Sequence, residues 1–465
     1  MADYTTIDNP ANHFNTVLYT GNGTAIGSGG NAITGVGFKP DFLWIKNRSS
    51  ALHHGVFDVV RGTPKRLLTS STAAEDSNAE TVDSFDADGF TVGSNSNVNG
   101  SGNSLVAWNW KAGGSAPAIT YSVKVVSDSG NKYRFDDFGT SAVTLDLQEG
   151  GTYTFDQSDS SNAGHPLRFS TTSNGTHGGG SEYTTGVTTT GTPGSSGAKT
   201  VITVAASAPT LYYYCTQHSG MGGQANTNST FGSSNFSGSI QSTVSANPTA
   251  GFCICSWTGD GSDATIGHGL GAVPKMIIHK HRSGSVQWNV YHVGAGTGGY
   301  LRLDGTGAFT SNSGFFGTAP TSSVFSPGSH SYMSGSGNDN IAYIFADVQG
   351  YLKFGTYTGN GNADGTFIYT GFKPAWVMIK RTDNAQSWQM SDNKRDTFNV
   401  VNKGLFADGN FAESSSSSYY IDYLSNGFKL KNTANWFNAS GGTYIYMAFA
   451  ESPFVNSNGV PTNAR

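Results

Sequence analysis

The sequence is poor in cysteine, in charge and in long hydrophobic runs. Its 465 residues include three cysteines, too few for a disulfide framework. Charged residues make up 12% of the chain, about half the share usual in globular proteins, and the net charge is −5. No segment approaches the roughly 18 consecutive apolar residues of a membrane span, so no membrane insertion is expected. No basic run is present, so no nucleic-acid partner is expected either.

The first eight residues also lack the features of a secretory signal. They contain neither a basic n-region nor an apolar h-region. Glycine, serine, threonine and asparagine take the place of charge, and glycine alone accounts for 63 residues. A polar, extracellular type of composition without a signal is typical of virion proteins, which are made in the host cytoplasm and exposed after lysis. We therefore expect a virion location.

Aromatic residues are plentiful at 12%, which is enough to build hydrophobic cores. They occur with β-branched residues in short runs that Gly, Asn and Ser clusters separate, a pattern that predicts an all-β protein. The length predicts more than one domain. The cysteines at 253 and 255 stand two apart on an expected strand and so share a face. We interpret them as buried free thiols.

Two strand signals occur three times along the chain. The first is a proline followed six residues later by a lysine, with an apolar strand between them. The second is a short apolar and aromatic strand at nearly constant distance from the first. They lie at Pro40–Lys46 and Val106–Trp110, at Pro274–Lys280 and Ile341–Phe345, and at Pro374–Lys380 and Ile445–Phe449. Common ancestry of three repeats is the best explanation. Trp108 and Trp110 are interpreted as core residues, with sugar stacking as the alternative.

The repeats define the expected domain organisation. Each is predicted to be an antiparallel β-sandwich of about 100 residues, and the Pro-x5-Lys strand to be central in its sheet. A different β domain interrupts them after a flexible joint at 113–117. The expected order is an N-terminal arm (1–13), repeat 1 (14–112), the inserted domain (118–226), a linker (227–249), repeat 2 (250–352), repeat 3 (353–454) and a C-terminal tail (455–465).

The inserted domain holds the most pointed chemical pattern in the chain. Cys215, His218 and Met221 have Cys-x2-His-x2-Met spacing after an aromatic strand, and His165 lies fifty residues upstream. One thiolate, two imidazoles and a thioether form the ligand set of a mononuclear blue-copper site. His177 is an alternative ligand, more readily explained as a loop residue. Zinc fits less well, because the set has a single thiol and a methionine.

The same segment resembles the cupredoxin family of Greek-key β-barrels. The resemblance rests on Leu145-Asp146-Leu147, on Tyr153-Thr154-Phe155-Asp156, on the Asn162–His165 loop and on Tyr213-Tyr214-Cys215. It implies a cupredoxin-like barrel in which His165, Cys215, His218 and Met221 bind copper, with a short ligand loop similar to that of amicyanin-like proteins. A scaffold without metal is the alternative. The expected fold class is thus all-β, with three β-sandwich repeats and one such barrel.

The repeats themselves resemble repeat domains of marine tailed phages, notably cyanophages. The likeness is carried by Gly37–Ser49, Val59–Gly62, Ser84–Phe90 and Ala107–Gly114. It is strong in repeat 1, moderate in repeat 3 and weaker in repeat 2. It implies a tail-fibre or other virion structural protein, partnered by other virion proteins.

The expected function is therefore non-enzymatic: a tail fibre, appendage or host-attachment component, with a capsid decoration protein as an alternative. A homo-oligomer, preferably a trimer, and a host surface glycan or receptor are the expected partners. Aromatic-bearing loops near Trp388 or Trp436 are candidate glycan contacts. A copper carrier or electron-transfer protein is a second alternative. A glycosidase would need paired carboxylates, but Asp86, Asp88 and Glu182 fall in expected turns.

Overall fold

The computed structural model describes residues 4–113, 116–227 and 231–462, which form two compact units. Unit 1 comprises 1–112, 246–264 and 269–465, and unit 2 comprises 113–245 and 265–268. Parts of the predicted arm, joint, linker and tail lie outside the described residues. None of the helices in the described part is long and apolar enough to cross a membrane.

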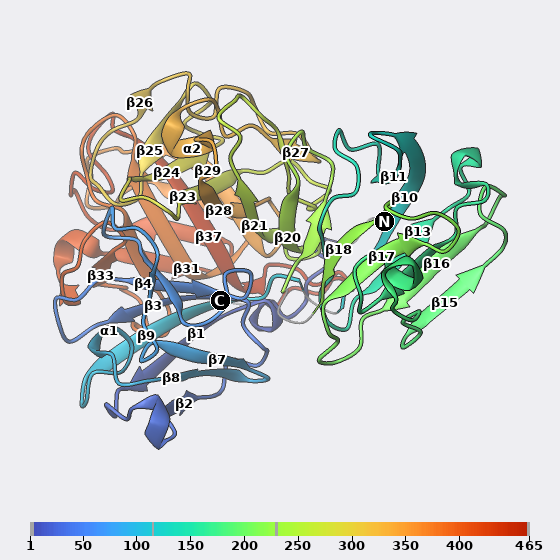
Figure 1. Cartoon of the computed structure of the whole chain (residues 1–465). Coiled ribbons are helices and arrows are strands. Elements are labelled where there is room, and N and C mark those ends of the chain that lie inside the picture. Colours follow the sequence, from blue (N-terminus) through green and yellow to red (C-terminus); the bar gives the residue numbers. More distant parts are fainter. Residues whose placement is uncertain (1–3, 114–115, 228–230, 463–465) are drawn as a thin grey trace. The chain divides into compact units, whose positions relative to one another are not determined.

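The prediction of an all-β protein is confirmed (Figure 1). In unit 1 each repeat contributes six strands to a sheet in the same order, and in repeat 2 these six belong to an eight-stranded sheet. Repeat 1 contributes β1 (Phe14–Thr20), β9 (Ser104–Trp110), β3 (Phe42–Asn47), β4 (Gly55–Asp58), β5 (Lys65–Leu68) and β6 (Asp76–Ser77). Repeat 2 contributes β21 (Phe252–Thr258), β28 (Asp339–Phe345), β23 (Met276–His281), β24 (Trp288–His292), β25 (Gly299–Arg302) and β26 (Thr310–Ser311). Repeat 3 contributes β29 (Leu352–Thr358), β37 (Thr443–Pro453), β31 (Phe372–Arg381), β32 (Gln389–Asp392), β33 (Lys403–Phe406) and β34 (Ser414–Ser415).

The two strand signals of each repeat pair with each other in one register. Trp44 is opposite Trp108, Ile278 is opposite Tyr343, and Met378 is opposite Met447. The Pro-x5-Lys strand is third of the six strands that each repeat contributes and lies inside its sheet in every case, so its predicted central position is confirmed. This shared register makes positions in the three repeats directly comparable.

Each central strand is apolar on both faces because it separates two cores. In repeat 1, Leu43 and Ile45 face a second sheet made of β2 (Asn31–Ile33), β8 (Gly89–Val92) and β7 (Val82–Asp86), whereas Phe42 and Trp44 face a core shared by all three repeats. Repeat 3 has the equivalent second sheet in β30 (Phe367–Tyr369), β36 (Gly427–Leu430) and β35 (Ile421–Leu424). Two short helices, α1 (Ser96–Asn99) and α2 (Ser331–Ser334), precede β9 and β28.

The three repeats pack together as one body around that shared core. Trp108 and Trp110 are buried in it, as predicted. Its aromatic rings join every pair of repeats: the ring centroids are 4.2 Å apart for Phe42 and Tyr343, 4.7 Å for Phe14 and Phe449, and 6.2 Å for Phe345 and Phe449. Ring pairs at such distances add to the hydrophobic free energy of burial.

The lysine of each central strand links its repeat to the next. Lys46, Lys280 and Lys380 are fully buried, and burial lowers the pKa of each to about 8. Each ammonium group donates to carbonyls of its own repeat and to one carbonyl of a neighbouring repeat: Asn410 for Lys46, Thr72 for Lys280 and Thr306 for Lys380. Repeat 1 thus reaches repeat 3, repeat 3 reaches repeat 2, and repeat 2 reaches repeat 1. The pattern closes a ring with approximate three-fold symmetry.

Two of the three junctions in this ring hold a buried ion network. Between repeats 1 and 2, Asp58, Arg61, Glu75 and Arg282 form a chain of ion pairs that Tyr343 completes by donating its hydroxyl to Asp58. Between repeats 3 and 1 the equivalent residues are Asp392, Arg395, Glu413, Arg48 and Trp108. Between repeats 2 and 3 the same five positions hold His292, Ala295, Phe309, Thr382 and Met447.

That third junction is closed by neutral groups instead. His292 is buried, and its Nε2 donates to the Tyr446 carbonyl at 3.1 Å. Phe309 keeps the backbone hydrogen bond to Thr382 that Glu75 makes to Arg282 and Glu413 makes to Arg48. All five side chains have therefore changed together while the backbone contact is retained.

Unit 2, where a Greek-key β-barrel was predicted, consists of two β-sheets that do not close into one continuous barrel. One sheet has the order β11-β10-β13-β16-β15, and the other has the order β12-β18-β17-β14. The first contains β10 (Ala118–Ser127), β11 (Asn131–Phe135), β13 (Thr152–Asp156), β15 (Val187–Thr190) and β16 (Lys199–Thr203); the second contains β12 (Leu145–Asp146), β14 (Leu167–Ser170), β17 (Leu211–Cys215) and β18 (Gly223–Asn226). Strand β13 pairs with both β10 and β16, whereas β14 pairs with β17. Strand pairing therefore stays within each sheet, and both sheets contribute to one shared hydrophobic core.

The predicted linker over 227–249 also differs from the structure. It contains β19 (Ser233–Asn235) and β20 (Ser242–Asn247), and Phe236 is buried in the core of unit 2. Polar strands of this kind carry no hydrophobic alternation, which is why the composition indicated a linker. On the side of unit 1, the chain leaves and returns at neighbouring points, since the Asn247 side chain donates to the Lys111 carbonyl. Close ends allow a large insertion at small cost to the host fold.

Candidate metal centre

The pairing of β14 with β17 brings the ends of two loops together. Leu167 is opposite Cys215, so the residues just before β14 lie beside the last residue of β17. His165 lies two residues before Leu167, the first residue of β14, and Cys215 is the last residue of β17. The seven residues 216–222 then connect β17 to β18 and carry His218 and Met221.

Three of the four predicted ligands converge. The Sγ atom of Cys215 lies 3.9 Å from Nδ1 of His165 and 3.8 Å from Nδ1 of His218, and these three atoms all lie within 4.8 Å of one another. An ion bound about 2.0–2.3 Å from a thiolate and two imidazoles would separate neighbouring ligand atoms by roughly 3.3–3.8 Å. The two distances from the thiol sulfur are therefore within a few tenths of an ångström of those in a metal-binding arrangement.

Met221 ends the same loop and is buried in the hydrophobic core that contains Cys215. Its carbonyl accepts the backbone N–H of Tyr133. The following residue must be glycine, because a Cβ at Gly222 would lie 1.7 Å from the Tyr213 carbonyl oxygen. The loop is thus drawn tightly against β17 at the point where Met221 turns inward.

The loop that carries His165 is held from several sides. The buried Asn162 side chain donates to the Val123 carbonyl, and the Asn162 carbonyl accepts the His165 N–H. The His165 carbonyl accepts two further side-chain hydrogen bonds, from Tyr133 and Gln157. Partners outside the ligand set fix the orientation of a metal ligand and tune its affinity.

The Cys215 loop has corresponding supports. Thr216 donates its N–H to the Pro166 carbonyl, which joins the two ligand loops directly. His177, on η4 (Gly175–Gly178), donates Nε2 to the Cys215 carbonyl at 3.0 Å. It therefore supports the backbone of the thiol ligand and lies outside the three-atom cluster, which answers the question of an alternative ligand.

Burial differs across the cluster. Cys215 is fully buried, His165 is half-buried and His218 is exposed. Burial, together with the neighbouring His218 ring, lowers the pKa of His165 and favours the neutral imidazole that binds metals. A soft thiolate with two imidazoles suits copper, and the exposed His218 would place a bound ion near the surface.

The other candidate residues have structural roles. Trp388 is buried, and its indole donates to the Arg302 carbonyl; Trp436 packs against Phe406 and Tyr419. Trp388 therefore serves the packing of repeat 3, whereas Trp436 keeps part of its surface exposed, and glycan contact at the loops near them stays a prediction. Cys253 and Cys255 are buried thiols outside any disulfide, as interpreted. Asp88 accepts the N–H groups of Gly35 and Gly37, Asp86 accepts the Thr91 hydroxyl, and Glu182 pairs with Arg168.

A comparison with protein families matches the repeats but not the segment that contains the His165, Cys215 and His218 cluster. A family described as a domain of unknown function (DUF7483) matches residues 9–134 and 223–453, well over half of the chain. The chain belongs to this family. The matched residues include the central strands of all three repeats, and the unmatched stretch 135–222 contains the whole His165, Cys215 and His218 cluster. No curated protein and no solved structure matches the chain.

Proposed function

We propose that this protein is a non-enzymatic structural component of a tailed-phage virion, a tail fibre or appendage that takes part in host attachment. The observation that carries the proposal is the ring of three repeats. Its shared core and buried inter-repeat lysines make a rigid body of a size and composition suited to a particle component. The likeness of the repeats to marine phage domains points in the same direction.

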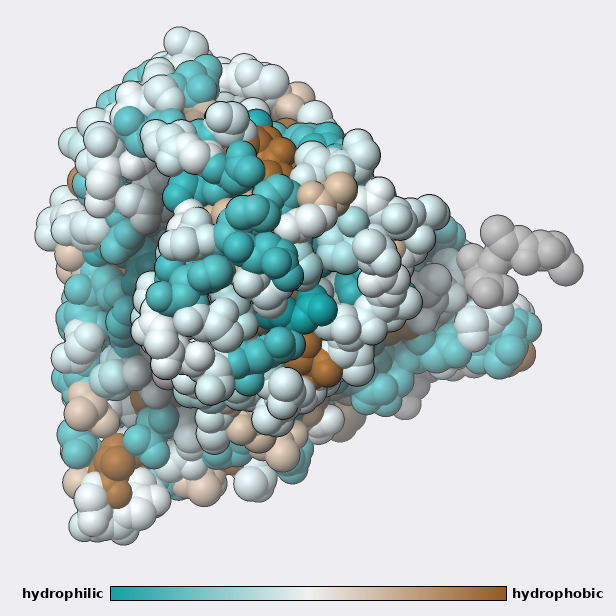
Figure 2. All heavy atoms as spheres, turned by 45° about the vertical axis from the view of Figure 1, so that its right-hand side comes forward, coloured by the Kyte–Doolittle hydropathy of each residue, from teal (hydrophilic) through white to brown (hydrophobic). Residues whose placement is uncertain are grey.

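The surface supports this proposal as well. Figure 2 shows hydrophobic residues in small, separate patches among hydrophilic and weakly polar ones. Side chains of low charge and low hydrophobicity limit non-specific association. Such a surface suits a protein that must stay soluble at high local copy number after lysis.

The test is localisation on purified particles. Cryo-electron microscopy with the chain traced into density should find it on the tail or a fibre. A position on the capsid lattice would favour a decoration protein instead. Absence from particles, checked by mass spectrometry of the same preparation, would refute a virion role.

We include a homotrimer in the same proposal. The alternative is a monomer, because the three repeats of one chain already form a ring. Three repeats in one chain already supply approximate three-fold symmetry, so one copy can present what a trimer of single-repeat chains would present. Light scattering of the purified chain distinguishes the two arrangements. A mass of three chains supports the trimer, and the mass of one chain supports the internal ring.

We also propose that unit 2 binds copper, as a carrier or electron-transfer module joined to the repeats. The supporting observation is the convergence of Cys215, His165 and His218 on one point. Copper added to the purified protein should give intense absorbance in the visible range. Cys215→Ser should abolish it, whereas Cys253→Ser, which changes a thiol in unit 1, should leave it unchanged.

A further inference from the structure

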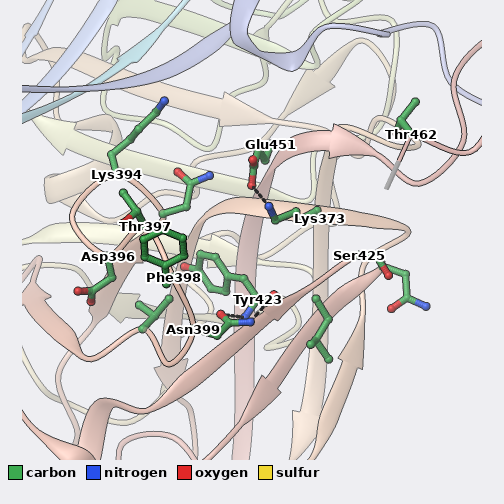
Figure 3. A pocket seen from close by; sticks show the side chains of 14 residues that line it. Lys373, Lys394, Asp396, Thr397, Phe398, Asn399, Tyr423, Ser425, Glu451 and Thr462 are labelled. Atoms are coloured by element: carbon green, nitrogen blue, oxygen red, sulfur yellow. Dashed lines mark hydrogen bonds and ion pairs between the residues drawn. The ribbon is translucent and has the colours of Figure 1, made fainter. Parts of the chain in front are cut away.

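A large cavity lies on repeat 3. Its volume is about 980 Å³, at the upper end of the usual range of small-molecule sites. One wall is the loop between β32 and β33, with Phe398 and Asn399. The opposite side is formed by β35 and the turn after it, and Lys373 with Glu451 closes a third side (Figure 3).

The loop that forms the wall is longer in this repeat than in the other two. Residues 393–402 connect β32 to β33, whereas the equivalent connections are 59–64 in repeat 1 and 293–298 in repeat 2. The additional residues bring Phe398 to the cavity with 80% of its surface exposed. The ring framework does not require the longer loop, because two repeats form the same sheet without it.

The first residue of this loop gives a second, independent indication. Asn393 lines the cavity, and its Oδ1 is buried with no hydrogen-bond partner among the described residues. At the same backbone position repeats 1 and 2 have Val59 and Val293. All three residues donate their N–H to the residue that follows the conserved proline, namely Asp41, Lys275 and Ala375. The fold therefore accepts valine here, and the unpaired amide oxygen needs another explanation.

The loop is held in place before any ligand arrives. The Asn399 side chain donates to the Tyr423 carbonyl and accepts the Tyr423 N–H, both at 2.8 Å. Asp396 accepts the N–H groups of Asn402 and Lys403, also at 2.8 Å. A loop ordered in this way exposes Phe398 without the entropy loss that a mobile loop would suffer on binding.

The charges around the cavity are largely balanced. Lys373 pairs with Glu451 at 2.8 Å, and Asp396 pairs with Lys403 at 3.3 Å. Lys394 also lines the cavity, is exposed and has no ion pair among the described residues. The other groups open to a ligand are an aromatic face and neutral polar side chains, among them the Asn393 amide. Amides both donate and accept hydrogen bonds, as hydroxyl groups do, and an aromatic ring covers the apolar face of a sugar.

We propose that this cavity binds a neutral oligosaccharide, with Phe398 stacking on a sugar ring and Asn393 hydrogen-bonding to its hydroxyl groups. The site would supply the recognition step of the attachment role and rests on that proposed function. It is distinct from the metal cluster, which lies in unit 2.

The test uses the full chain on an array of defined neutral oligosaccharides of hexose and N-acetylhexosamine units, followed by calorimetric titration of the best binder. Phe398→Ala and Asn393→Val should each weaken binding at least tenfold. Asn393→Val should also preserve or raise the urea midpoint, because it installs the residue of the other repeats. Phe411→Ala removes another exposed phenylalanine, outside the cavity, and should leave affinity unchanged.

An array on which the wild-type chain binds no member would overturn the inference, as would binding that both cavity variants retain. These outcomes are separate from a failure of the virion proposal. A chain found in particles without saccharide binding refutes only the cavity inference. A chain that binds saccharide but is absent from particles refutes only the virion role.

Discussion

The buried ion network between repeats 1 and 2 allows a sharp test of how the ring is stabilised. Arg61 has no exposed side-chain surface and contacts Asp58 at 2.5 Å, Glu75 at 3.2 Å and the Val56 carbonyl at 3.0 Å. Arg61→Ala would leave the equally buried Asp58 carboxylate without its cation. Removing one partner of a buried pair costs about 3–5 kcal/mol.

The chain itself supplies the compensating change. The junction between repeats 2 and 3 has His292, Ala295 and Met447 where this junction has Asp58, Arg61 and Tyr343. The triple variant D58H/R61A/Y343M should therefore be more stable than R61A alone by roughly 1–3 kcal/mol, the usual range for coupled neighbours. Adding two substitutions to a damaging one is thus expected to restore stability.

Urea unfolding followed by tryptophan fluorescence suits this test. All eight tryptophans lie in unit 1, so the signal reports on the ring alone. Lys353→Ala, which removes a partly exposed pair with Asp347, serves as the control and should cost no more than about 1 kcal/mol. The reasoning is refuted if R61A loses less than about 1 kcal/mol, or if the triple variant is no more stable than R61A.

Three further predictions follow from buried groups and from the metal cluster. Lys280→Met should destabilise unit 1 by about 2–3 kcal/mol in the same assay, because the Thr72 and Val286 carbonyls lose a charged donor; a loss equal to that of Lys353→Met would contradict this. Burial lowers the pKa of His279 to about 3 and of His292 to about 4, below the unfolded value of about 6.5. The free energy of unfolding should therefore be full above pH 6.5 and fall as the pH drops toward 4. The slope should reach up to about 1.4 kcal/mol per pH unit for each histidine. His292→Gln should reduce that slope between pH 6.5 and 4, and an unchanged slope would argue against it. Copper at a hundred times its dissociation constant should stabilise unit 2 by about 2.7 kcal/mol, measured by tyrosine circular dichroism; no gain, or the same gain in Cys215→Ser, would contradict the metal site.

The sequence was sufficient for the repeats because their signals are local. A proline that cannot continue a strand, a buried apolar run and a lysine at fixed spacing mark the central strand without knowledge of its neighbours. Most of the candidate ligand set was found for the same reason, since Cys215, His218 and Met221 lie within seven residues at the end of β17 and on the loop that follows it. His165 was added by its resemblance to a known ligand pattern, and the register of β14 with β17 then brought it to the thiol.

The packing of the repeats could not be read in this way. The contacts that close the ring join residues such as Lys280 and Thr72, or Arg48 and Glu413, which lie hundreds of positions apart. No local pattern identifies such partners. The cavity on repeat 3 was missed because it depends on a loop insertion, and the strands β19 and β20 were missed because their polar composition resembles that of a linker.

Comparison among the three repeats distinguishes residues that stabilise the ring from residues that the fold does not explain. A position that all three copies share, such as the buried lysine, serves the ring, because each copy makes the same inter-repeat contact. The ion networks show that one of three junctions can change all five side chains and still close. At that junction the departing residues take over the closure themselves, as His292 does by donating to the Tyr446 carbonyl. Asn393 differs from those positions: two copies have valine on the same backbone, and the third has an amide whose oxygen no described residue pairs, on a residue that lines a cavity. The difference between copies therefore points to a ligand and not to the fold.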